Sequence, residues 1–365
     1  MPAPQQNPEI RGFNAVRAAL KDFEAFSSDL QGDRDVRDYK QLPLELDPPR
    51  HTLFRDAAQP YFHSDYLASL VPQFRQLATE LLAKLRVGGQ FEVGRDLALP
   101  YVMGCLTIVY KRPQDYDEWL SWGPDVWTAG AYAKTPVDQS IHLEGPRSGA
   151  QLQAYLDRVF DAAVANPVAV NGTDGGDIWD FVSQLVVAGV PVTRAEMQGI
   201  ANVLLAGGRD TVIKLITGLF WHLALTPQDR EWLTANEAAR PLAIGEMVRF
   251  LTPLPKMERI RTQDGQAVNV SFLSANYDPT AFDRPDVVNF HRGRTPHLGF
   301  GLGRHSCMGR NVTEHEVGAL LDVLLETWSG WQLAGEPDID WVMDGDIRYL
   351  NKFLKVGAVS ASPQL

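Results

Sequence analysis

The stretch FGLGRHSCMG, residues 300–309, contains the residue types of a ligand-binding loop followed by a helix. Its glycines allow the main chain to approach a ligand closely, and Cys307 stands near its end. Apolar residues then repeat at helical spacing from Val317 to Trp328, which predicts a helix that begins just after the cysteine. Free N–H groups at a helix start favour the thiolate, the form of cysteine that binds metal.

Two alternatives to a metal site have to be weighed for this loop. A lone cysteine is most often a small buried apolar residue, and we interpret Cys105, in the apolar run from Tyr101 to Tyr110, in that way. For Cys307 the flanking pattern favours a ligand. The loop glycines do not form a dinucleotide-binding fingerprint, because the strand, the G-x-G-x-x-G turn and the helix do not follow in that order. With two cysteines in the chain, neither a disulfide framework nor a multi-cysteine metal site is expected.

A long apolar segment predicts the central helix of the fold. Thr193 and Glu196 fit a capping box, and Thr226 before a proline marks the end, so we predict one helix of about 33 residues, roughly 50 Å long. The sequence AGGRDT, residues 206–211, stands in its middle. Two glycines there cost about 1 kcal/mol each relative to alanine. A flat ligand, a local kink or tight helix packing would each explain them, and this segment alone leaves these alternatives open.

Composition limits the classes of protein to which the chain can belong. It has 365 residues, of which 45% are hydrophobic and 22% are charged, as in globular proteins. A net charge of −11 argues against broad binding to nucleic acid or to anionic membranes. The most apolar stretch, Ile200 to Leu225, carries charged residues in its middle, which argues against a membrane helix. The first residues show no secretory signal, so a soluble, cytoplasmic protein is expected.

Helical patterns dominate the rest of the chain. Residues 66–85 and 151–164 alternate apolar and polar positions at helical spacing, whereas a β-like piece spans residues 268–272. Prolines and glycines at residues 171–177 and 292–297 predict loops. No repeat and no Pro/Ser-rich linker is present, so we predict a mainly α protein with a small β region in one compact unit.

Five motifs together resemble the cytochrome P-450 monooxygenases of the soluble bacterial type. Residues 300–309 look like the haem-binding loop of this family, and residues 207–211 resemble the oxygen-binding groove of its long central helix. Residues 246–249, with Glu and Arg three apart, resemble the Glu-x-x-Arg motif. The meander is matched by NYDP, Phe, Pro and Arg within residues 276–292, and PPRHTLFR, residues 48–55, resembles the haem-propionate helix.

The resemblance covers about residues 10–357 and implies a fold and a cofactor. The fold would be a single haem-thiolate domain over residues 1–365 with a long central helix, lacking the family's usual N-terminal helix and first strands. The cofactor would be heme b, with Cys307 as the axial ligand of its iron; His305 is the rival ligand. The remaining contacts to the haem would come from His51, Arg55, Arg259 and His305 at the propionates, Phe300 in the loop, and Gly207 and Gly208 beside the bound O2.

Some of these assignments keep an alternative. His51 and Arg55, at i and i+4, would by themselves be a solvated helix face, and Arg261 could replace Arg259. Glu246 and Arg249, three residues apart, share one helix face, and the resemblance implies that Arg292 joins them in a buried structural triad under the haem loop.

The resemblance also assigns the oxygen chemistry. Asp210 and Thr211 would deliver the protons that oxygen activation consumes, since a hydroxyl can pass protons and an acid can supply them. The family's usual second hydroxyl is absent, because Val212 follows. The acid–alcohol pair argues for electrons from NAD(P)H through a separate ferredoxin, for which Arg304 and Arg310 are candidate docking residues.

The leading functional hypothesis is therefore an enzyme that inserts one atom of O2 into a small, mostly apolar organic molecule, by hydroxylation or oxidative demethylation. A haem-thiolate isomerase, dehydratase or reductase is the alternative, and a haem-free helical scaffold is the third class. The partners implied are a ferredoxin and a small-molecule substrate, without nucleic acid or membrane. The pocket would be lined by Tyr39, Leu42, Leu44, Leu204, Leu205, Leu254 and Met257.

Overall fold

The computed structural model describes residues 7–29, 39–122 and 148–360. Its α-helices are α1 (Phe13–Lys21), α2 (Arg50–Ala58), α3 (Ser64–Gly88), α4 (Leu99–Val109), α5 (Tyr116–Ser121), α7 (Ser148–Ala165), α8 (Ile178–Ser183), α9 (Arg194–Gly207), α10 (Asp210–Leu225), α11 (Pro227–Ala235), α12 (Arg240–Leu251), α13 (Phe272–Asn276) and α14 (Arg310–Thr327). Its strands are β1 (Glu9–Ile10), β2 (Phe26–Ser27), β3 (Gln90–Glu92), β4 (Val170–Asn171), β5 (Asp174–Gly175), β6 (Val186–Val187), β7 (Val190–Pro191), β8 (Lys256–Arg261), β9 (Gln266–Ser271), β10 (Trp331–Leu333), β11 (Asp338–Asp344), β12 (Ile347–Lys355) and β13 (Gly357–Ser360).

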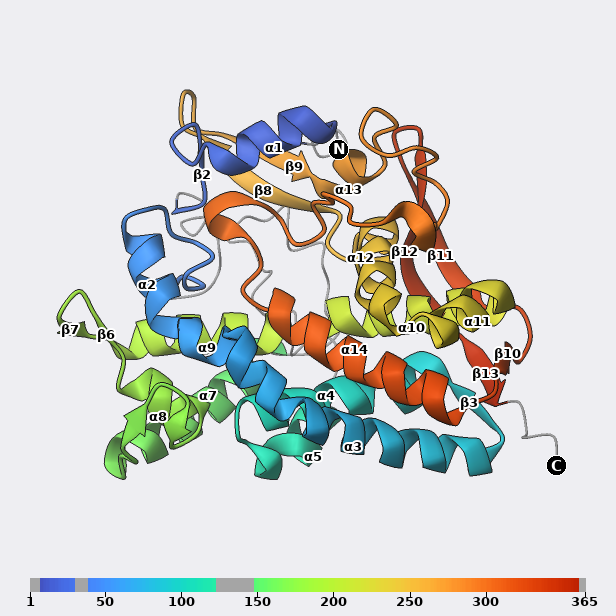
Figure 1. The fold of residues 1–365 in the computed structure, drawn as a ribbon. Helices are drawn as coiled ribbons and strands as arrows, with labels where there is room; N and C mark the ends of the chain where they lie inside the picture. Colours follow the sequence, from blue (N-terminus) through green and yellow to red (C-terminus); the bar gives the residue numbers. More distant parts are fainter. Residues whose placement is uncertain (1–6, 30–38, 123–147, 361–365) are drawn as a thin grey trace.

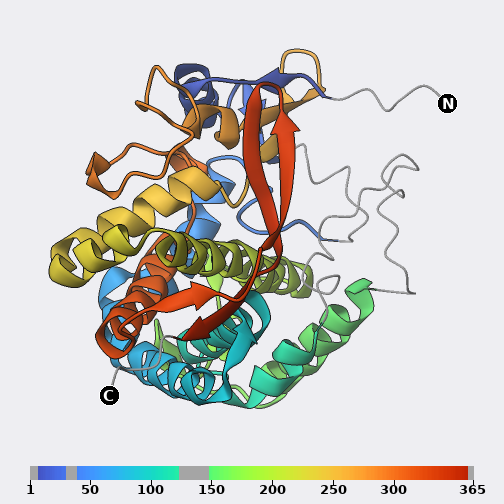
Figure 2. The same cartoon turned by 90° about the vertical axis from the view of Figure 1, so that its right-hand side faces the viewer.

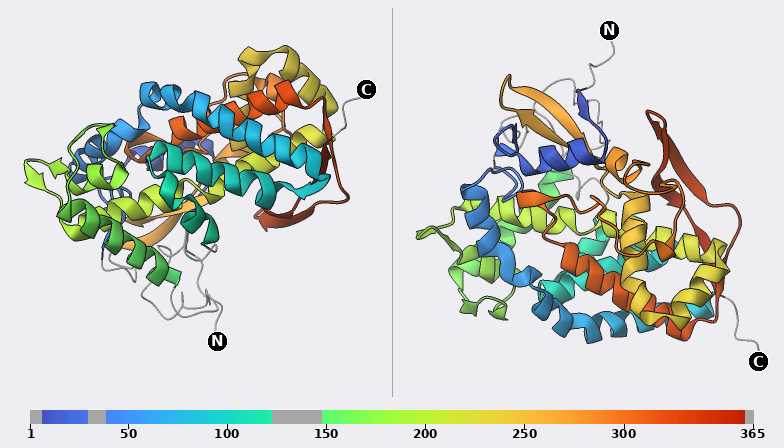
Figure 3. Two further views of the ribbon diagram at one scale, coloured as in Figure 1. Left: turned by 90° about the horizontal axis from the view of Figure 1, so that it is seen from below. Right: turned by 45° about the horizontal axis from the view of Figure 1, so that its top comes forward.

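A helical body and a small sheet above it make up the molecule. Helices α9 and α10 pass through the middle of this body, with α14 in front of them in the view of Figure 1. The hairpin of β11 and β12 runs along one side and reaches up to the sheet (Figure 2). Seen from below, α3 and α14 lie side by side (Figure 3). The prediction of a mainly α protein with a small β region is confirmed.

The upper sheet joins the N-terminal segment to the hairpin of residues 256–271. Its order is β1-β9-β8-β2, with β1 parallel to β9 and the other pairs antiparallel. Register within the central hairpin places Arg259 opposite Val268. An apolar cluster that includes Phe13, Val16 and Phe282 fills the space between α1 and this sheet, which fixes α1 above the loop that precedes α14.

The central helix differs from its prediction in one respect. The capping box of Thr193 and Glu196 forms as expected, and the helical segment ends at Leu225. Between these ends, however, the helix is broken at Gly208 and Arg209 and continues as α10. The Arg209 backbone, at φ −103° and ψ −77°, lies outside the helical range and turns the chain there. One continuous helix was therefore wrong, and the kink is one of the alternatives that the two glycines had left open.

Smaller elements follow the sequence closely. Helices α3 and α7 cover the segments predicted from residues 66–85 and 151–164. The β-like piece at 268–272 is strand β9, except that Phe272 already begins α13. The loop predicted at 171–177 contains the short β4–β5 hairpin, whose two strands are too brief to show an alternating pattern.

The main core surrounds the central helix. Cys105 in α4 is fully buried within it, as predicted for a small apolar residue. Next to it in α4, Leu106 lies 3.1 Å from the position that a Cβ on Gly208 would take, and the Tyr110 hydroxyl, which follows α4, donates to the Leu204 carbonyl at 2.9 Å. These contacts hold α9 against α4 just before the break.

Candidate active site

The loop before α14 presents Cys307 through a set of backbone hydrogen bonds. The Cys307 N–H donates to the Phe300 carbonyl at 2.8 Å, which closes the loop on itself. Gly303 adopts φ +75°, and a Cβ on it would lie 2.7 Å from the Leu20 carbonyl oxygen of α1. Glycine is therefore required at this position by both conformation and space. Helix α14 has its N-cap at Gly309, so the predicted helix start next to Cys307 is confirmed.

Burial and the neighbouring groups shift the pKa of the Cys307 thiol in opposite directions. Its side chain is accessible to solvent although protein atoms surround it, as for a group at the floor of an interior space. Burial raises the pKa of the thiol, while the backbone N–H groups of Gly309 and Arg310 and the charge of Arg55 act in the opposite direction. The N–H groups at the helix start thus act toward the thiolate, as expected, but burial has the larger effect. A bound metal cation would favour the thiolate form of Cys307, because coordination deprotonates a thiol.

Four cationic or hydrogen-bonding side chains converge beside this loop. The His51 and His305 rings lie 4.1 Å apart, although one belongs to α2 and the other to the loop. Arg55, one turn after His51, donates to the Ser306 carbonyl at 2.7 Å. Burial, then the charges of Arg259, His51 and Arg55, lower the pKa of His305 to about 3. His51 is buried, and Arg55 donates to the cysteine loop. These two residues therefore do not form the solvated helix face that was the alternative.

Unsatisfied polar atoms in this cluster indicate an anionic ligand. Nδ1 of His51 and Nε2 of His305 are buried and find no hydrogen-bond partner among the described residues. Burial, and then the charge of Arg55, lower the pKa of His51 to about 4, and the charge of Asp47 opposes this shift only in part. Carboxylates such as the propionates of a haem would accept from these groups, so the residues present fit that cofactor.

Arg259 and Arg261 differ in their burial and in their partners, and this difference shows which of them could bind a ligand. Arg259 is buried, donates to the Glu258 carbonyl, and burial lowers its pKa to about 10. Arg261 lies two residues further along β8 and pairs with Asp264 at 2.6 Å. The structure therefore places Arg259, and not Arg261, in the cluster with His305.

The break in the central helix exposes a different set of groups. A Cβ added to Gly207 would meet nothing within 4 Å, so open space lies beside this residue, whereas Gly208 packs against Leu106. The Thr211 hydroxyl donates to the Gly207 carbonyl at 3.3 Å across the break. Asp210 forms an ion pair with the buried Arg209 while its own side chain stays 53% exposed. The break thus carries the Thr211 hydroxyl and the Asp210 carboxylate, and an open space lies beside Gly207.

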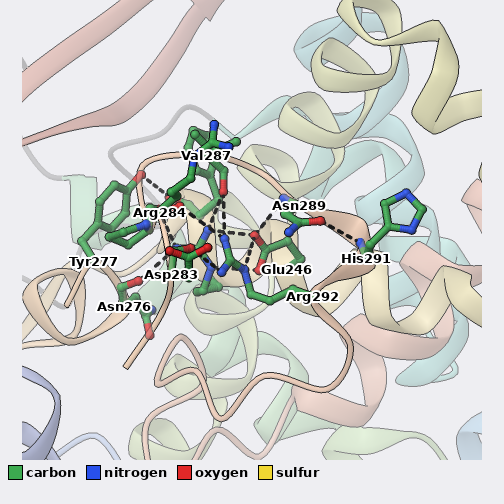
Figure 4. A network of polar contacts seen from close by, with 12 residues as sticks. Glu246, Asn276, Tyr277, Asp283, Arg284, Val287, Asn289, His291 and Arg292 are labelled. Carbon is green, nitrogen blue, oxygen red and sulfur yellow. Dashed lines mark hydrogen bonds and ion pairs between the residues drawn. The ribbon is translucent and has the colours of Figure 1, made fainter. Parts of the chain in front are cut away.

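The predicted triad of Glu246, Arg249 and Arg292 is present, with Glu246 and Arg249 buried and Arg292 half-buried. Figure 4 shows Glu246 and Arg292 in this network. Two nitrogens of Arg249 each donate to Glu246 at 2.8 Å, and Nε of Arg292 donates to the same carboxylate at 3.2 Å. Arg249 also donates to the carbonyl oxygens of Asn276, at 2.9 Å, and Val287, at 3.1 Å. The charges are therefore fully hydrogen-bonded and join α12 to the segment that leads into the cysteine loop.

The residues predicted to line a substrate pocket fall into two groups. Leu42, Leu204 and Leu205 are buried in the main core, while Leu254 is 39% exposed. Tyr39, Leu44 and Met257 are half-buried.

Two polar contacts near these residues were missed from the sequence. The Gln41 amide bonds to Asn202, which is buried in α9, and the Asp47 carboxylate accepts from the Ser28 backbone N–H at 2.9 Å. Asp47 directly precedes the Pro-Pro pair, and this was the only signal that could have singled it out.

Comparison with known proteins agrees with this geometry. The profile of the family Cytochrome P-450 matches residues 243–340, which contain the triad and the cysteine loop. The cyclomarin C epoxidase CymV of Salinispora arenicola is 27% identical over 344 residues, which make up 89% of this chain and 84% of that protein. The pentalenic acid synthase of Streptomyces avermitilis is 26% identical over 349 residues, covering 90% and 83% of the two chains.

Solved structures show the same fold. A carbohydrate-active P-450 superposes with a TM-score of 0.82 at 25% identity, covering 96% of this chain and 91% of that one. A cytochrome P-450 from Chondromyces apiculatus superposes with a TM-score of 0.80 at 23% identity, covering 100% of this chain and 92% of that one.

Among the described residues, none of the helices combines the length and the apolar character that a membrane span requires. The family profile spans the charge triad and the cysteine loop, and the overall fold is that of solved P-450 structures, so the chain is identified as a cytochrome P-450 monooxygenase, a member of a family of haem-containing oxidoreductases.

Proposed function

We propose that this protein inserts one atom of O2 into a small, mostly apolar organic substrate, with electrons that come from NAD(P)H through a separate ferredoxin. The observation that carries the proposal is the convergence of the Cys307 loop with the unsatisfied cluster of His51, Arg55, Arg259 and His305. An anionic macrocycle with a central metal would satisfy both halves of this site at once. A haem bound to a cysteine thiolate supplies O–O cleavage chemistry.

Each residue of the cluster has a defined task in this proposal. Cys307 would bind the haem iron through its sulfur, and Gly303 allows its loop to pack closely against α1. His51, His305 and Arg259 would bind the propionates, and their burial would make each of these bonds stronger than on the surface.

Arg55 has a second task besides a propionate contact. Through its bond to the Ser306 carbonyl it ties α2 to the loop that carries Cys307. Phe300, whose carbonyl accepts from the Cys307 N–H, closes the loop from the other side. The domain that holds these residues extends in this proposal over the whole chain, residues 1–365.

Oxygen activation is assigned to the break in the central helix. Gly207 leaves the space beside the cofactor in which O2 would bind, and Gly208 allows α9 to approach α4. Thr211 passes protons through its hydroxyl, and Asp210 exchanges them with solvent through its exposed side chain. Arg209 keeps the Asp210 carboxylate in place without burying it.

Electron delivery is assigned to the exposed side of the cysteine loop. Arg304 is exposed and directly precedes His305, which makes it a docking contact for an acidic ferredoxin. Arg310 is a weaker candidate, because it already pairs with Glu314 at 2.7 Å.

Turnover with isotopically labelled O2 tests the proposal. The purified haem protein is supplied with NAD(P)H, a surrogate ferredoxin and its reductase, after a substrate has been selected from a panel by its effect on the haem spectrum. We expect one labelled oxygen atom in each product molecule. Consumption of substrate without label in the product would contradict the proposal and indicate an isomerase, dehydratase or reductase.

A further inference from the structure

A lysine follows the Asp210–Thr211 pair by one turn of α10. Lys214 lies four residues after Asp210 and three after Thr211, and residues at these spacings share one face of a helix. Long side chains on a helix point back over the preceding turn. Lys214 therefore lies on the face of α10 that carries the acid and the alcohol.

The surroundings of this amine are unusual for a charged group. Nζ of Lys214 lies 6.0 Å from the centre of the Tyr349 ring in β12. Within residues 7–29, 39–122 and 148–360, the Lys214 amine pairs with no carboxylate and donates no hydrogen bond. Asp210, the nearest acid along the helix, is bound to Arg209 instead. Burial alone lowers the pKa of the Lys214 amine to about 7.

Among the described residues, the charged groups on the elements around α10 do not provide a counter-ion for Lys214. Tyr349 from β12 is the titratable side chain in contact with it. Several acids on the elements packed against α10 have other partners: Asp96 pairs with Arg95, Asp229 with His222 and Glu246 with Arg249, while burial raises the pKa of Glu316. A cationic side chain kept half-buried without a counter-ion is costly, which suggests a use for its exchangeable proton.

We propose that Lys214 is the proton reservoir that recharges Thr211 during oxygen activation. This inference rests on the proposed monooxygenase function. The ammonium gives a proton to the Thr211 hydroxyl, directly or through one water, as the hydroxyl passes its own proton onward. The neutral amine that remains takes a proton from solvent, so charge balances and no electron moves. Lys214 acts through Thr211 and does not contact the substrate.

The pKa of the Lys214 amine suits this task. A group that exchanges protons near neutral pH is half-charged under working conditions and can both give and accept.

Substitution by an isosteric apolar residue tests the proposal. In Lys214→Met we expect product formed per NAD(P)H consumed to fall roughly 10-fold, with the missing electrons released as peroxide. Lys352→Met, which removes an exposed lysine from the strand that carries Tyr349, is the control and should behave as the wild type. Coupling in the wild type should also fall as the pH rises through about 7, because the amine then loses its proton. A Lys214→Met enzyme with wild-type coupling and a wild-type pH profile would overturn the proposal.

Thermal unfolding of the holoprotein gives a readout that is independent of turnover. The pKa of the amine is about 7 in the folded state and about 10.4 in an unfolded chain. The unfolded state therefore binds more protons between these values, so Lys214 makes the wild-type Tm rise with pH across this window, and the rise should be smaller in Lys214→Met. An equal rise in both proteins would show that the amine is not buried and would overturn the proposal.

The carbon-monoxide difference spectrum separates failure of this inference from failure of the proposed function. A thiolate-type band in wild type and Lys214→Met, with unchanged coupling in the variant, contradicts the role of Lys214 alone. Absence of that band from the wild type contradicts both.

Discussion

Gly303 shows how a single residue determines the position of the cysteine loop. Its φ of +75° lies in the region that side chains avoid, and its missing Cβ makes room for the Leu20 carbonyl. Because α1 packs on the loop at this point, any side chain there has to push the two elements apart. The loop geometry thus depends on a residue that makes no contact with a ligand.

A substitution at Gly303 should therefore cost stability. We expect Gly303→Ala to lower the free energy of unfolding by about 1–3 kcal/mol, measured by urea denaturation of the holoprotein. Gly318→Ala in α14 is the matched control, since a Cβ there meets nothing within 4 Å, and it should leave the stability unchanged or raise it by up to about 1 kcal/mol. Equal stability of the two variants would contradict the steric argument.

Thr211 carries the second prediction at the scale of a residue. Its hydroxyl lies at the break, bonded to the Gly207 carbonyl, and Thr211 does not belong to the buried core, so we expect its removal to change proton transfer and to leave the core packed. In Thr211→Ala we expect product per NAD(P)H to fall about 10-fold or more while NAD(P)H consumption continues. Thr211→Ser keeps the hydroxyl and should retain most of the coupling. Full coupling in the alanine variant would refute a role for this hydroxyl.

The sequence located these residues, but it did not establish their surroundings. Cys307, Gly207 and Thr211 were identified from local motifs, which depend only on neighbouring residues. The approach of Leu20 to Gly303 and the packing of Leu106 on Gly208 depend on residues far away in the chain. No local pattern contains that information, so these contacts could be found only in the structure.

At the scale of elements, the central helix shows where prediction failed and why. Its two ends were predicted correctly, because a capping box and a proline act locally. The break was not assigned, because helix propensity alone cannot tell glycines that kink a helix from glycines that pack against a neighbour. The structure shows that the two glycines differ: open space lies beside Gly207, whereas Gly208 packs against α4.

The Glu246 triad supports a prediction about how α12 is joined to the loop region. Glu246 is buried and accepts from both Arg249 and Arg292, so neutralising it strands the buried charge of Arg249 and the half-buried charge of Arg292. We expect Glu246→Gln to destabilise the protein by about 3–5 kcal/mol in urea denaturation.

The control for this triad is a comparable pair on the surface. Glu314 pairs with Arg310 in an exposed position, and Glu314→Gln should change the stability by less than about 0.5 kcal/mol. A loss for Glu246→Gln as small as that of the control would mean that the triad does not hold these elements together.

On the scale of the whole molecule, the propionate cluster draws on three distant parts of the sequence. His51 comes from α2, Arg259 from the upper sheet and His305 from the cysteine loop. A cofactor bound by all three should stabilise the folded chain as a unit, because it binds the native state and not the unfolded one. The sequence motifs gave each residue separately, and the fold brings them to one place.

Haem affinity provides the prediction for this scale. Arg259→Met removes a buried charged donor and should weaken haem binding by about 1.5–3 kcal/mol, measured by transfer of haem to an acceptor apoprotein. Arg261→Met, two residues away on the same strand but paired with Asp264 on the surface, should bind haem as the wild type does. The reverse order of effects would assign the propionate contact to Arg261.

The ligand of the iron is the central claim, and the carbon-monoxide difference spectrum of the reduced protein measures it most directly. The account predicts the band of a thiolate-ligated haem in the wild type, and its loss in Cys307→Ala and in Cys307→His. A wild-type spectrum of the nitrogen-ligated type, or a thiolate band that survives the replacement of Cys307, would contradict it.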